Sequence, residues 1–387
     1  MANVSSSNGL EKRPKLRFQG FDEPWKVFKA EELFQNVTDK NHPDETVLTI
    51  IQGKGTLPRD QAGRNIHYDD ASLSNYKKVE QGDFIIHLRS FEGGLEMANE
   101  AGIVSPAYTI LRCKRPHSSL FYDAYFHTDE FINHNLSKSV EGIRDGRQIS
   151  YEAFKWLGIP YCEPTEQEKI SSLFSVLNER IAKQRDLVES LKKYKRGLVK
   201  ALISGTVAFD GSEHERWETV SLAEIFTISA GGDIDRQNSS PSCSTSYPYP
   251  VYANALTNNG LYGYANYFKV KGDSITVSGR GEVGHAIARH RKYVPIVRLL
   301  SLVPKYGDDV DFFAYMINAT SIYIESTGVP QLTSPQLGAV KVLRPPICEQ
   351  KRLSSLLMKM DAKLENEERL TFYMEKIRAF MLQQLFI

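Results

Sequence analysis

The sequence is poor in cysteine, and its cysteines are scattered. The four residues Cys113, Cys162, Cys243 and Cys348 form neither a CxxC pair nor a Cys/His cluster with zinc-like spacing. This pattern argues against a disulfide framework and predicts reduced cysteines, as in cytoplasmic proteins. No stretch approaches the roughly 18 apolar residues of a membrane-spanning helix, and no apolar run follows the charges of the N-terminus. We therefore expect a soluble, cytoplasmic protein without a metal site.

A large excess of charge is absent too. The chain has 48 Lys and Arg against 47 Asp and Glu, which gives a formal net charge of +1. A nucleic-acid-binding protein can be neutral overall when acidic surfaces offset a basic face, so only the local distribution of charge is informative. Apolar residues make up 41% and charged residues 25% of the 387 residues, which argues against disorder and suffices for two ordinary domains.

Catalytic motifs are missing as well. The sequence has no GxxxxGK phosphate loop, no GxSxG motif, and no Asn or Asp followed by Pro-Pro-aromatic, which an amino-methyltransferase would carry. The segment with Pro43, Asp44 and Gln52-Gly53-Lys54 resembles a metal-dependent nuclease pattern only faintly, because the neutral Gln52 is a poor ligand for a hard cation. We expect no catalytic residues in this chain.

Three glycines match a pattern found in dinucleotide-binding sites. Gly279, Gly281 and Gly284 match the GxGxxG pattern of dinucleotide sites after a strand-like segment. Such a site also needs a helix long enough to pack on the sheet, and Pro295 would stop any helix early. We expect a glycine-rich turn between strands, and no cofactor in this chain.

The most regular feature is a predicted helix over residues 165–205. About 38 helical residues would make a rod of about 57 Å, a length seen in coiled coils. Thr165 with Glu168 fits a capping box at its start, and lysines gather near its end, where the helix dipole favours cations. Its apolar stripe, at steps of three and four, consists of Ile170, Leu173, Leu177, Ile181, Leu187, Leu191, Tyr194, Leu198 and Leu202. An amphipathic rod of this length needs a partner.

The partner is predicted within the same chain. Adding 183 to each position from 148 to 202 gives a second copy without a gap, in which Glu166 falls on Glu349, Gln167 on Gln350, Leu173 on Leu356 and Leu187 on Leu370. A weaker repeat, at an offset of 192, places Trp25 on Trp217 and Glu32 on Glu224. The chain is therefore an internal duplication with the order variable domain, long helix, variable domain, long helix.

Two polar residues occupy matching positions in the middle of the two stripes. Gln184 and Glu367 stand where an apolar residue is expected, and polar groups at such positions tend to fix the register of paired helices. If the helices pack antiparallel, the two residues would face each other or nearly so. The alternative, that both lie at the edge of the stripe, is equally compatible with the pattern.

These features predict a mixed α/β (α+β) protein with a pseudo-two-fold internal repeat. We place the first domain at residues 1–164 with a flexible arm at 1–15, the first helix at 165–205, the second domain at 206–344 and the second helix at 345–387. Strands are expected at 46–51, 83–88, 108–112, 274–278 and 296–303, and short helices at 121–135, 151–157 and 312–319. The two long helices are expected to pair with each other as a coiled coil between the domains.

Polar loops recur at similar places in both domains. Arginine and amide side chains are the groups that read base edges, and Lys with further Arg holds phosphates. The candidate DNA-binding residues of the first domain are Lys54, Arg59, Arg64, His87, Arg89 and Ser90. Those of the second domain are Asn254, Asn258, Asn259, Ser278, Arg280, Arg289, His290, Arg291 and Lys292. We expect Arg89, Arg280 and Asn258 to read bases, and Lys54, Arg289 and Lys292 to contact phosphates.

Five stretches carry a resemblance to a known family over nearly the whole length. They are PKLRFQGFDEPW, GRQISYEAFKWLGIPYCEPTEQEKISSLFSVLNERI, YPVYANALTNNGLYGY, SITVSGRGEVG and STGVPQLTSPQLGAVKVLRPPICEQKRL. In these stretches the chain resembles the specificity subunit of type I restriction-modification systems. The resemblance implies two target-recognition domains, each reading one half of a split DNA sequence, and two helices that form an antiparallel coiled coil and act as a spacer. It also implies two modification subunits, which hold S-adenosylmethionine, and a restriction subunit that can join them.

Two other classes of protein remain as alternatives. A helical adaptor whose domains bind proteins would explain the long helices, but it gives no reason for paired basic and amide-rich loops. A self-sufficient methyltransferase or nuclease is disfavoured by the missing motifs. DNA binding that weakens steeply with added salt would favour the first interpretation over the adaptor.

Overall fold

The computed structural model describes residues 13–62, 70–141, 148–203, 217–320 and 331–386. The chain divides into two compact units. The first unit comprises residues 1–185 and 369–387, and the second unit comprises residues 186–368. Each unit combines small β-sheets with helices, which confirms the predicted mixed fold class.

The first unit is built around a four-stranded antiparallel sheet. Its order is β2 (Phe34–Val37), β9 (Thr109–Cys113), β6 (Phe84–Ile86) and β7 (Glu96–Met97). Four antiparallel strand pairs surround it: β1 (Lys26–Lys29) with β12 (Gly158–Tyr161), β3 (Leu48–Ile51) with β4 (Gly55–Pro58), β5 (Lys77–Val79) with β8 (Gly102–Val104), and β10 (Val140–Glu141) with β11 (Gln148–Ile149). Its short α-helices are α1 (Ala30–Leu33), α2 (Ser90–Gly93), α3 (Ser119–Phe126) and α4 (Tyr151–Phe154).

The second unit has two four-stranded sheets. The first is antiparallel, in the order β14 (Phe226–Ala230), β21 (Leu300–Pro304), β18 (Ser274–Val277) and β19 (Ala286–Arg289). The second has the order β15 (Ser239–Ser240), β17 (Leu261–Ala265), β16 (Tyr249–Tyr252) and β20 (Val294–Pro295), in which β16 and β20 run parallel. β13 (Glu218–Ser221) pairs with β22 (Lys341–Arg344), and the short helices are α6 (Leu222–Ile225), α7 (Val310–Ala319) and α8 (Ser334–Gly338).

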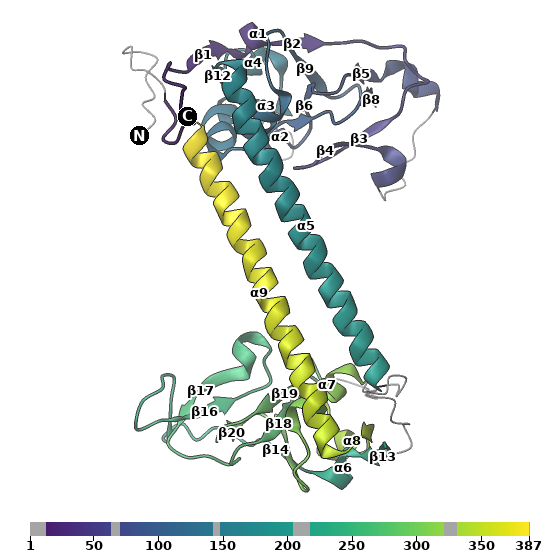
Figure 1. Cartoon of the computed structure of the whole chain (residues 1–387), viewed down its shortest axis with the longest axis vertical. Helices are drawn as coiled ribbons and strands as arrows, with labels where there is room; N and C mark the ends of the chain where they lie inside the picture. The colour runs from purple at the N-terminus through teal and green to yellow at the C-terminus, as the bar shows by residue number, and fades with distance from the viewer. Residues whose placement is uncertain (1–12, 63–69, 142–147, 204–216, 321–330, 387) are drawn as a thin grey trace. The chain divides into compact units, whose positions relative to one another are not determined.

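Two long helices complete the chain. Helix α5 spans Pro164–Ile203 and helix α9 spans Ile347–Leu385, with 40 and 39 residues. Figure 1 draws both as continuous ribbons, α5 in teal and α9 in yellow. Each unit contains a part of both helices, so the helices are described within the units that hold them.

Within each unit the two helices pair in opposite directions. In the first unit, Nε of Arg378 donates to Oδ1 of Asn178 at 2.5 Å, and Nε of Arg185 donates to Oε1 of Glu375 at 3.0 Å. In the second unit, Lys195 forms an ion pair with Asp361, and Nζ of Lys192 lies 3.0 Å from Oε1 of Glu368. In each unit, later residues of α5 contact earlier residues of α9, which confirms the predicted antiparallel pairing inside each unit.

Each unit has its own hydrophobic core, and both helices contribute to each core. In the first unit, Phe174 of α5 and Leu382 of α9 are buried with a cluster of aromatic side chains. The aromatic cluster includes Trp25, Phe34, Phe84, Phe121, Tyr122, Phe126 and Phe131. In the second unit, Leu202 of α5 and Leu353 and Leu357 of α9 are buried against α7 and the antiparallel sheet. A fully buried Leu or Phe contributes about 1.5–3 kcal/mol, so these contacts tie the helices to the domains.

The buried stripe of α5 differs from the predicted one. Phe174 and Val188 are buried at 2% and 6% exposure, whereas Leu187, expected in the stripe, is 41% exposed. Its repeat partner Leu370 is 42% exposed, and Leu173 and Leu356 are half-buried. The step pattern was ambiguous because two adjacent apolar rows run along the helix, and only tertiary packing selects one of them.

Gln184 and Glu367, the polar residues in the middle of the two helices, differ in burial. Gln184 is 6% exposed and therefore belongs to the buried stripe of the first unit, not to its edge. Glu367 is half-buried and belongs to the second unit. Whether the two side chains face each other stays a prediction, because the two residues belong to different units.

The predicted strands and short helices are found with two differences. The helix expected at 121–135 is two separate elements: α3 ends at Phe126, and a short π-helix spans Glu130–Asn135. The strand expected at 296–303 begins only at Leu300, because Val297 and Arg298 adopt positive φ angles of 53° and 60°. A left-handed pair of residues turns the chain and breaks a strand ladder, and sequence alone gave no sign of it.

The duplication is visible in the strand registers. Phe84 pairs with Leu111 in the first unit and Ile275 with Leu302 in the second, so both partners are displaced by 191 positions. The side chain of Glu32 accepts from the backbone N of Lys29 at 2.7 Å, and Glu224 accepts from the N of Ser221 at 2.8 Å. The sequence repeat at Glu32 and Glu224 therefore corresponds to the same helix-capping contact in each unit.

Candidate nucleic-acid interface

An exposed arginine follows the same strand in each unit. Strand β6 ends at Ile86, and Arg89 is the third residue after it; strand β18 ends at Val277, and Arg280 is the third residue after it. The two arginines are displaced by the same 191 positions as the paired strands, so they are equivalent in the duplicated fold. Both side chains are exposed.

In the second unit a tight hairpin loop presents Arg280. The loop connects the antiparallel strands β18 and β19, which confirms that the GxGxxG segment is a turn between strands. Gly281 and Gly284 have φ angles of 73° and 89°, which favour glycine. Ser278 is 6% exposed, accepts from the N of His285 at 2.9 Å and donates to the carbonyl of Glu282. Ser278 therefore closes the loop and does not lie open at its surface.

Asn254 joins three loops of the second unit. Its Oδ1 accepts from the N of Gly279 at 2.8 Å, and its Nδ2 donates to the carbonyl of Val297. A Cβ on Gly279 would lie only 2.9 Å from the carbonyl oxygen of Arg298, so the loop and the left-handed turn touch directly. The amide of Asn254 is thus committed to the backbone, and it positions the loop that carries Arg280.

Arg289, expected to contact phosphate, is buried. It is 7% exposed, and its Nη2 donates to the carbonyl of Asn259 at 2.7 Å while its Nε donates to Oγ1 of Thr276 at 2.9 Å. The guanidinium lies 3.7 Å from the ring centroid of Tyr252, and burial lowers its pKa. Arg289 supports the neighbouring turn from inside, where a phosphate cannot reach it in this conformation.

That turn exposes two asparagines. Asn258 and Asn259 are exposed and have left-handed φ angles of 51° and 50°. Asparagine is among the few non-glycine residues that accept this conformation readily. In the hairpin loop, Arg280 donates from Nε and Nη2 to Oε1 of Gln331, at 3.2 and 3.0 Å. Arg280 and Gln331 thus place a guanidinium beside an amide, whereas contacts of Asn258 and Asn259 with DNA stay predictions.

The three basic residues after β19 lie elsewhere. His290, Arg291 and Lys292 follow the end of β19, whereas the loop of Arg280 precedes its start. His290 bridges Asp273 and Asp311, with N–O distances of 3.0 and 3.1 Å, and the hydrogen bond to Asp273 raises its pKa. The structure therefore does not bring these residues together with Arg280 at one end of the strand.

Lys292 and Arg291 differ in their surroundings. The Nζ of Lys292 lies 4.6 Å from the ring centroid of Phe268, which is a cation–π contact at the surface. Both side chains are exposed. Their proposed contacts with phosphate stay predictions.

In the first unit the basic residues occupy two neighbouring loops. Lys54 is exposed in the turn between β3 and β4, and the guanidinium of Arg59 lies 5.9 Å from the ring centroid of Tyr76. Arg64 lies outside the described residues. After β6, Ser90 is fully buried and accepts from the N of His87 at 2.9 Å, and Nδ1 of His87 accepts from the N of Arg89 at 3.2 Å. These hydrogen bonds of His87 and Ser90 shape the turn that presents Arg89. Burial lowers the pKa of His87.

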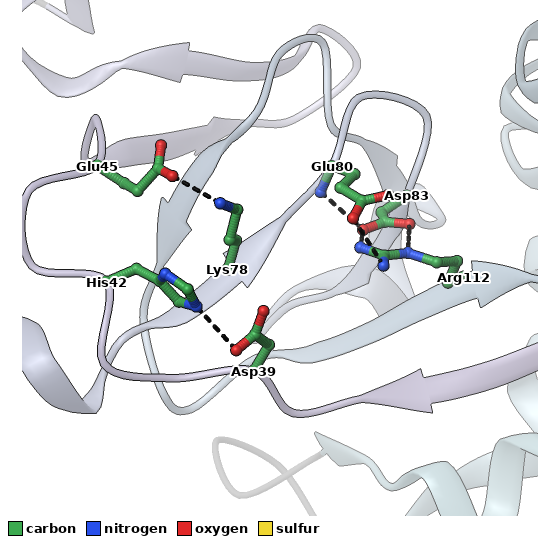
Figure 2. A network of polar contacts seen from close by, with 7 residues as sticks. All are labelled: Asp39, His42, Glu45, Lys78, Glu80, Asp83 and Arg112. Atoms are coloured by element: carbon green, nitrogen blue, oxygen red, sulfur yellow. Dashed lines mark hydrogen bonds and ion pairs between the residues drawn. The ribbon is translucent and has the colours of Figure 1, made fainter.

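A polar network holds the strand that leads to Arg89. Figure 2 shows Arg112 of β9 against Asp83 and Glu80, which precede β6. Nε and Nη2 of Arg112 donate to the two carboxylate oxygens of Asp83 at 2.9 and 2.7 Å, and its Nη1 lies 3.0 Å from Glu80. The side chain of Asp83 is 4% exposed, and the hydrogen bond to Asp83 raises the pKa of Arg112. This bidentate pair fixes the start of β6, whose end carries the exposed arginine.

Two further ion pairs in Figure 2 secure the loop beside β5. Nζ of Lys78 donates to Oε1 of Glu45 at 2.6 Å, and Nε2 of His42 lies 2.8 Å from Oδ1 of Asp39. The hydrogen bond to Lys78 lowers the pKa of Glu45. The His42–Asp39 contact is solvent-exposed and the Lys78–Glu45 pair is partly buried, and contacts near the surface stabilise a loop only modestly.

Sequence reasoning missed the residues that join each domain to its helix. Nε1 of Trp25 donates to Oε2 of Glu166 at 3.1 Å, and Nε1 of Trp217 donates to Oε2 of Glu349 at 3.0 Å. Nε2 of Gln167 donates to the carbonyl of Cys162, and that of Gln350 to the carbonyl of Pro345, both at 2.8 Å. The signal was present, because the Trp, Glu and Gln of each junction are identical at the two repeat offsets.

The described residues show no other specialised site. No group of three His, Cys, Asp or Glu among them could hold a metal ion. None of the helices within the described ranges is long and apolar enough to cross a membrane. The four cysteines are free.

Comparisons with known proteins agree with this architecture. Residues 214–371 match the family model described as "Type I restriction modification DNA specificity domain". Two proteins of Mycoplasma pneumoniae that are named as type I specificity subunits are 25% identical over 192 residues and 31% identical over 111 residues. These matches cover 49% and 29% of this chain, and 52% and 33% of the two relatives, so the chain spans about half or less of their length.

Solved structures extend the similarity to nearly the whole chain. The type I S subunit of M. genitalium superimposes with a TM-score of 0.61 and 17% identity, covering 97% of this chain and 99% of its own. The HsdS subunit of Thermoanaerobacter tengcongensis gives a TM-score of 0.52 and 15% identity, with 95% and 98% coverage. At such identities the likeness shows a shared fold. The family match adds that residues 214–371 of this chain are similar to the DNA specificity domain of type I restriction-modification systems.

Proposed function

We propose that this chain is the non-catalytic, sequence-specific DNA-binding subunit of a type I restriction-modification complex in the cytoplasm. Each domain reads one half of a bipartite DNA target. The observation that supports this most is the equivalence of Arg89 and Arg280, which are both exposed and both follow the same strand of a duplicated sheet. A duplicated fold that presents one guanidinium per domain suits a target with two half-sites, since arginine reads guanine through two hydrogen bonds.

The long helices set the distance between the half-sites in this proposal. A helix of 40 residues rises by about 60 Å, whereas one turn of DNA is about 34–36 Å long. Removing one heptad from α5 and one from the facing part of α9 shortens each by about 10 Å, or about three base pairs. The spacer should shrink by that amount while both half-sites stay the same. An unchanged spacer would refute the role of the helices as a ruler.

The helices also dock two modification subunits, which hold S-adenosylmethionine and carry out the methylation, and restriction subunits can join. The support for assembly is the similarity, at a TM-score of 0.56 and 14% identity, to a chain solved in work on complex assembly of the type I R-M system. Co-purification of the chain with the modification subunit encoded beside it tests this point. A chain that stays alone at micromolar concentration would contradict it.

DNA binding distinguishes this function from a protein-binding adaptor. Binding of the complex to a DNA duplex should weaken steeply with salt, because each phosphate contact releases condensed counterions. Arg89→Ala and Arg280→Ala should each change the sequence preference of one half-site only. An adaptor has no reason to show either effect.

A further inference from the structure

The turn between β3 and β4 is held more firmly than a hairpin needs. It exposes Gln52, Gly53 and Lys54, and Gly53 and Gly55 have φ angles of 74° and 76°. Glu96 lies beneath it, accepting from the N of Gly53 at 2.7 Å and from the N of Gly55 at 2.9 Å. The two carboxylate oxygens thus each hold one backbone N–H of the turn.

A second side chain holds the carbonyl groups of the same turn. Nδ2 of Asn99 donates to the carbonyl of Lys54 at 2.7 Å and to that of Thr56 at 2.9 Å. The backbone N of Asn99 also donates to Oγ1 of Thr56 at 3.0 Å. Glu96 and Asn99 together make five hydrogen bonds to a segment of four residues, which fixes the position of its exposed tip.

The arrangement requires a buried charge. Glu96 is 0% exposed, and Nε2 of His127 lies 3.3 Å from its Oε1. Burial alone would raise the pKa of Glu96, but the hydrogen bonds from His127 and the two glycine N–H groups outweigh it and lower the pKa. Hairpin turns close without such a device, and a buried ion pair adds little stability, so its effect is to position the turn.

The side chain amide of Gln52 packs against Gly93. A Cβ on Gly93 would lie 2.0 Å from Nε2 of Gln52 and 2.8 Å from its Cδ, so no larger residue fits there without moving the amide. Gly93 is the last residue of α2, which begins directly after Arg89. One helical turn, about 6 Å, therefore separates the seat of Gln52 from the arginine that follows β6.

From this geometry we infer that Gln52 is a specificity-determining residue whose amide reads an adenine in the half-site of the first domain. A glutamine amide carries one donor and one acceptor, which match N7 and the N6 amino group of adenine. The turn is fixed from below by Glu96 and Asn99, and Gly93 leaves room for the amide beside Arg89. An amide and a guanidinium presented about one helical turn apart suit the reading of nearby base pairs. This inference rests on the proposed function.

The experiment uses the complex of the full chain with its modification subunit, expressed in a host without methylation. Genome-wide mapping of methylated adenines gives the target motif for wild type, Gln52→Leu and Gly93→Ala. The leucine keeps the size of Gln52 and removes its hydrogen bonds, whereas Gly93→Ala keeps the amide and displaces it. The control is Gln35→Leu, the same change at an exposed glutamine of β2. Strand β2 is the edge of the sheet opposite to β7, the strand whose Glu96 holds the turn of Gln52. Thermal unfolding confirms that all variants fold.

The expected result is specific to one base pair. In Gln52→Leu and Gly93→Ala, the preference for adenine at one position of one half-site should fall by about an order of magnitude. The other half-site, the spacer and the control should match wild type. Equal loss of methylation at all sites, or an unchanged motif, would overturn the role of Gln52 while leaving the proposed function intact. A wild-type complex without any split motif would instead overturn the proposed function itself.

Discussion

The junction between the first domain and helix α5 makes a strong prediction about stability. The side chain of Glu166 is 1% exposed; Arg17 donates to its two oxygens at 2.7 and 2.9 Å, and Trp25 donates at 3.1 Å. Glu166→Gln keeps the size of the side chain but replaces one acceptor oxygen with a donor and leaves Arg17, itself 15% exposed, without its counter-ion. Breaking a buried ion pair in this way costs about 3–5 kcal/mol, and the partial exposure of Arg17 places this pair near 3 kcal/mol.

The predicted change is measurable by calorimetry of the full chain. The first unit holds 185 + 19 = 204 residues, and in a domain of this size 1 kcal/mol shifts the melting temperature by about 2–4 °C. Glu166→Gln should therefore lower the melting temperature by about 6–12 °C. Helix α5 begins at Pro164, so Thr165 lies inside it and the predicted capping box with Glu168 is wrong. Glu168→Gln, the same change at an exposed glutamate one half-turn further along α5, should therefore lower the melting temperature by less than about 2 °C. Equal shifts in the two variants would refute the reasoning.

Three further predictions follow from the site. Arg280→Ala should relax one base position by about 1–3 kcal/mol without lowering thermal stability, and Arg89→Ala should do so in the other half-site, as read from methylation motifs; a uniform loss at all sequences would indicate phosphate contacts instead. Arg289→Ala should destabilise the second unit by about 1–3 kcal/mol in urea unfolding, because the carbonyl of Asn259 loses its donor; an unchanged midpoint would contradict the supporting role. His127→Gln should destabilise the first unit most between about pH 4.3 and 6.5, because burial, which would lower the pKa of His127, is outweighed by its hydrogen bonds to Glu96 and Asp123 together with the charges of both carboxyl groups, whereas the pKa of Glu96 is lowered. Urea unfolding at pH 5.5 and 8.5 checks this sign: the stabilisation is present below the ordinary pKa of histidine and is lost as the pH rises through the raised value, so a larger effect at pH 8.5 would contradict it.

Much of the fold was predictable because the chain carries the same information twice. The gapless repeat revealed the two helices and made each the natural partner of the other, since a repeated apolar stripe has a matching stripe to pack against. Their antiparallel direction was implied by the family resemblance and not by the repeat. The choice of stripe was less certain. Leu187 and Val188 are adjacent on the helix, and only the domain that covers one row decides which is buried.

The candidate site was predictable in part. Arg89 and Arg280 stood out because each lies in a polar loop directly after a strand-like segment rich in apolar and β-branched residues, a pattern that sequence shows directly. Arg289 lies in an equally basic stretch, yet it is buried under Tyr252 and holds the turn of Asn259. Burial of a charged residue depends on partners distant in sequence, and charge patterns carry no information about them. Glu96 and Asn99 were missed for the same reason, because each acts on a hairpin more than 40 residues earlier.

The most direct test of the central claim is the methylation pattern of the complex. The chain is co-expressed with its modification subunit, and methylated adenines are mapped across the genome. The account predicts one split motif, with two short half-sites separated by a spacer of fixed length. A stable complex that methylates nothing, or that methylates one continuous motif, would contradict it.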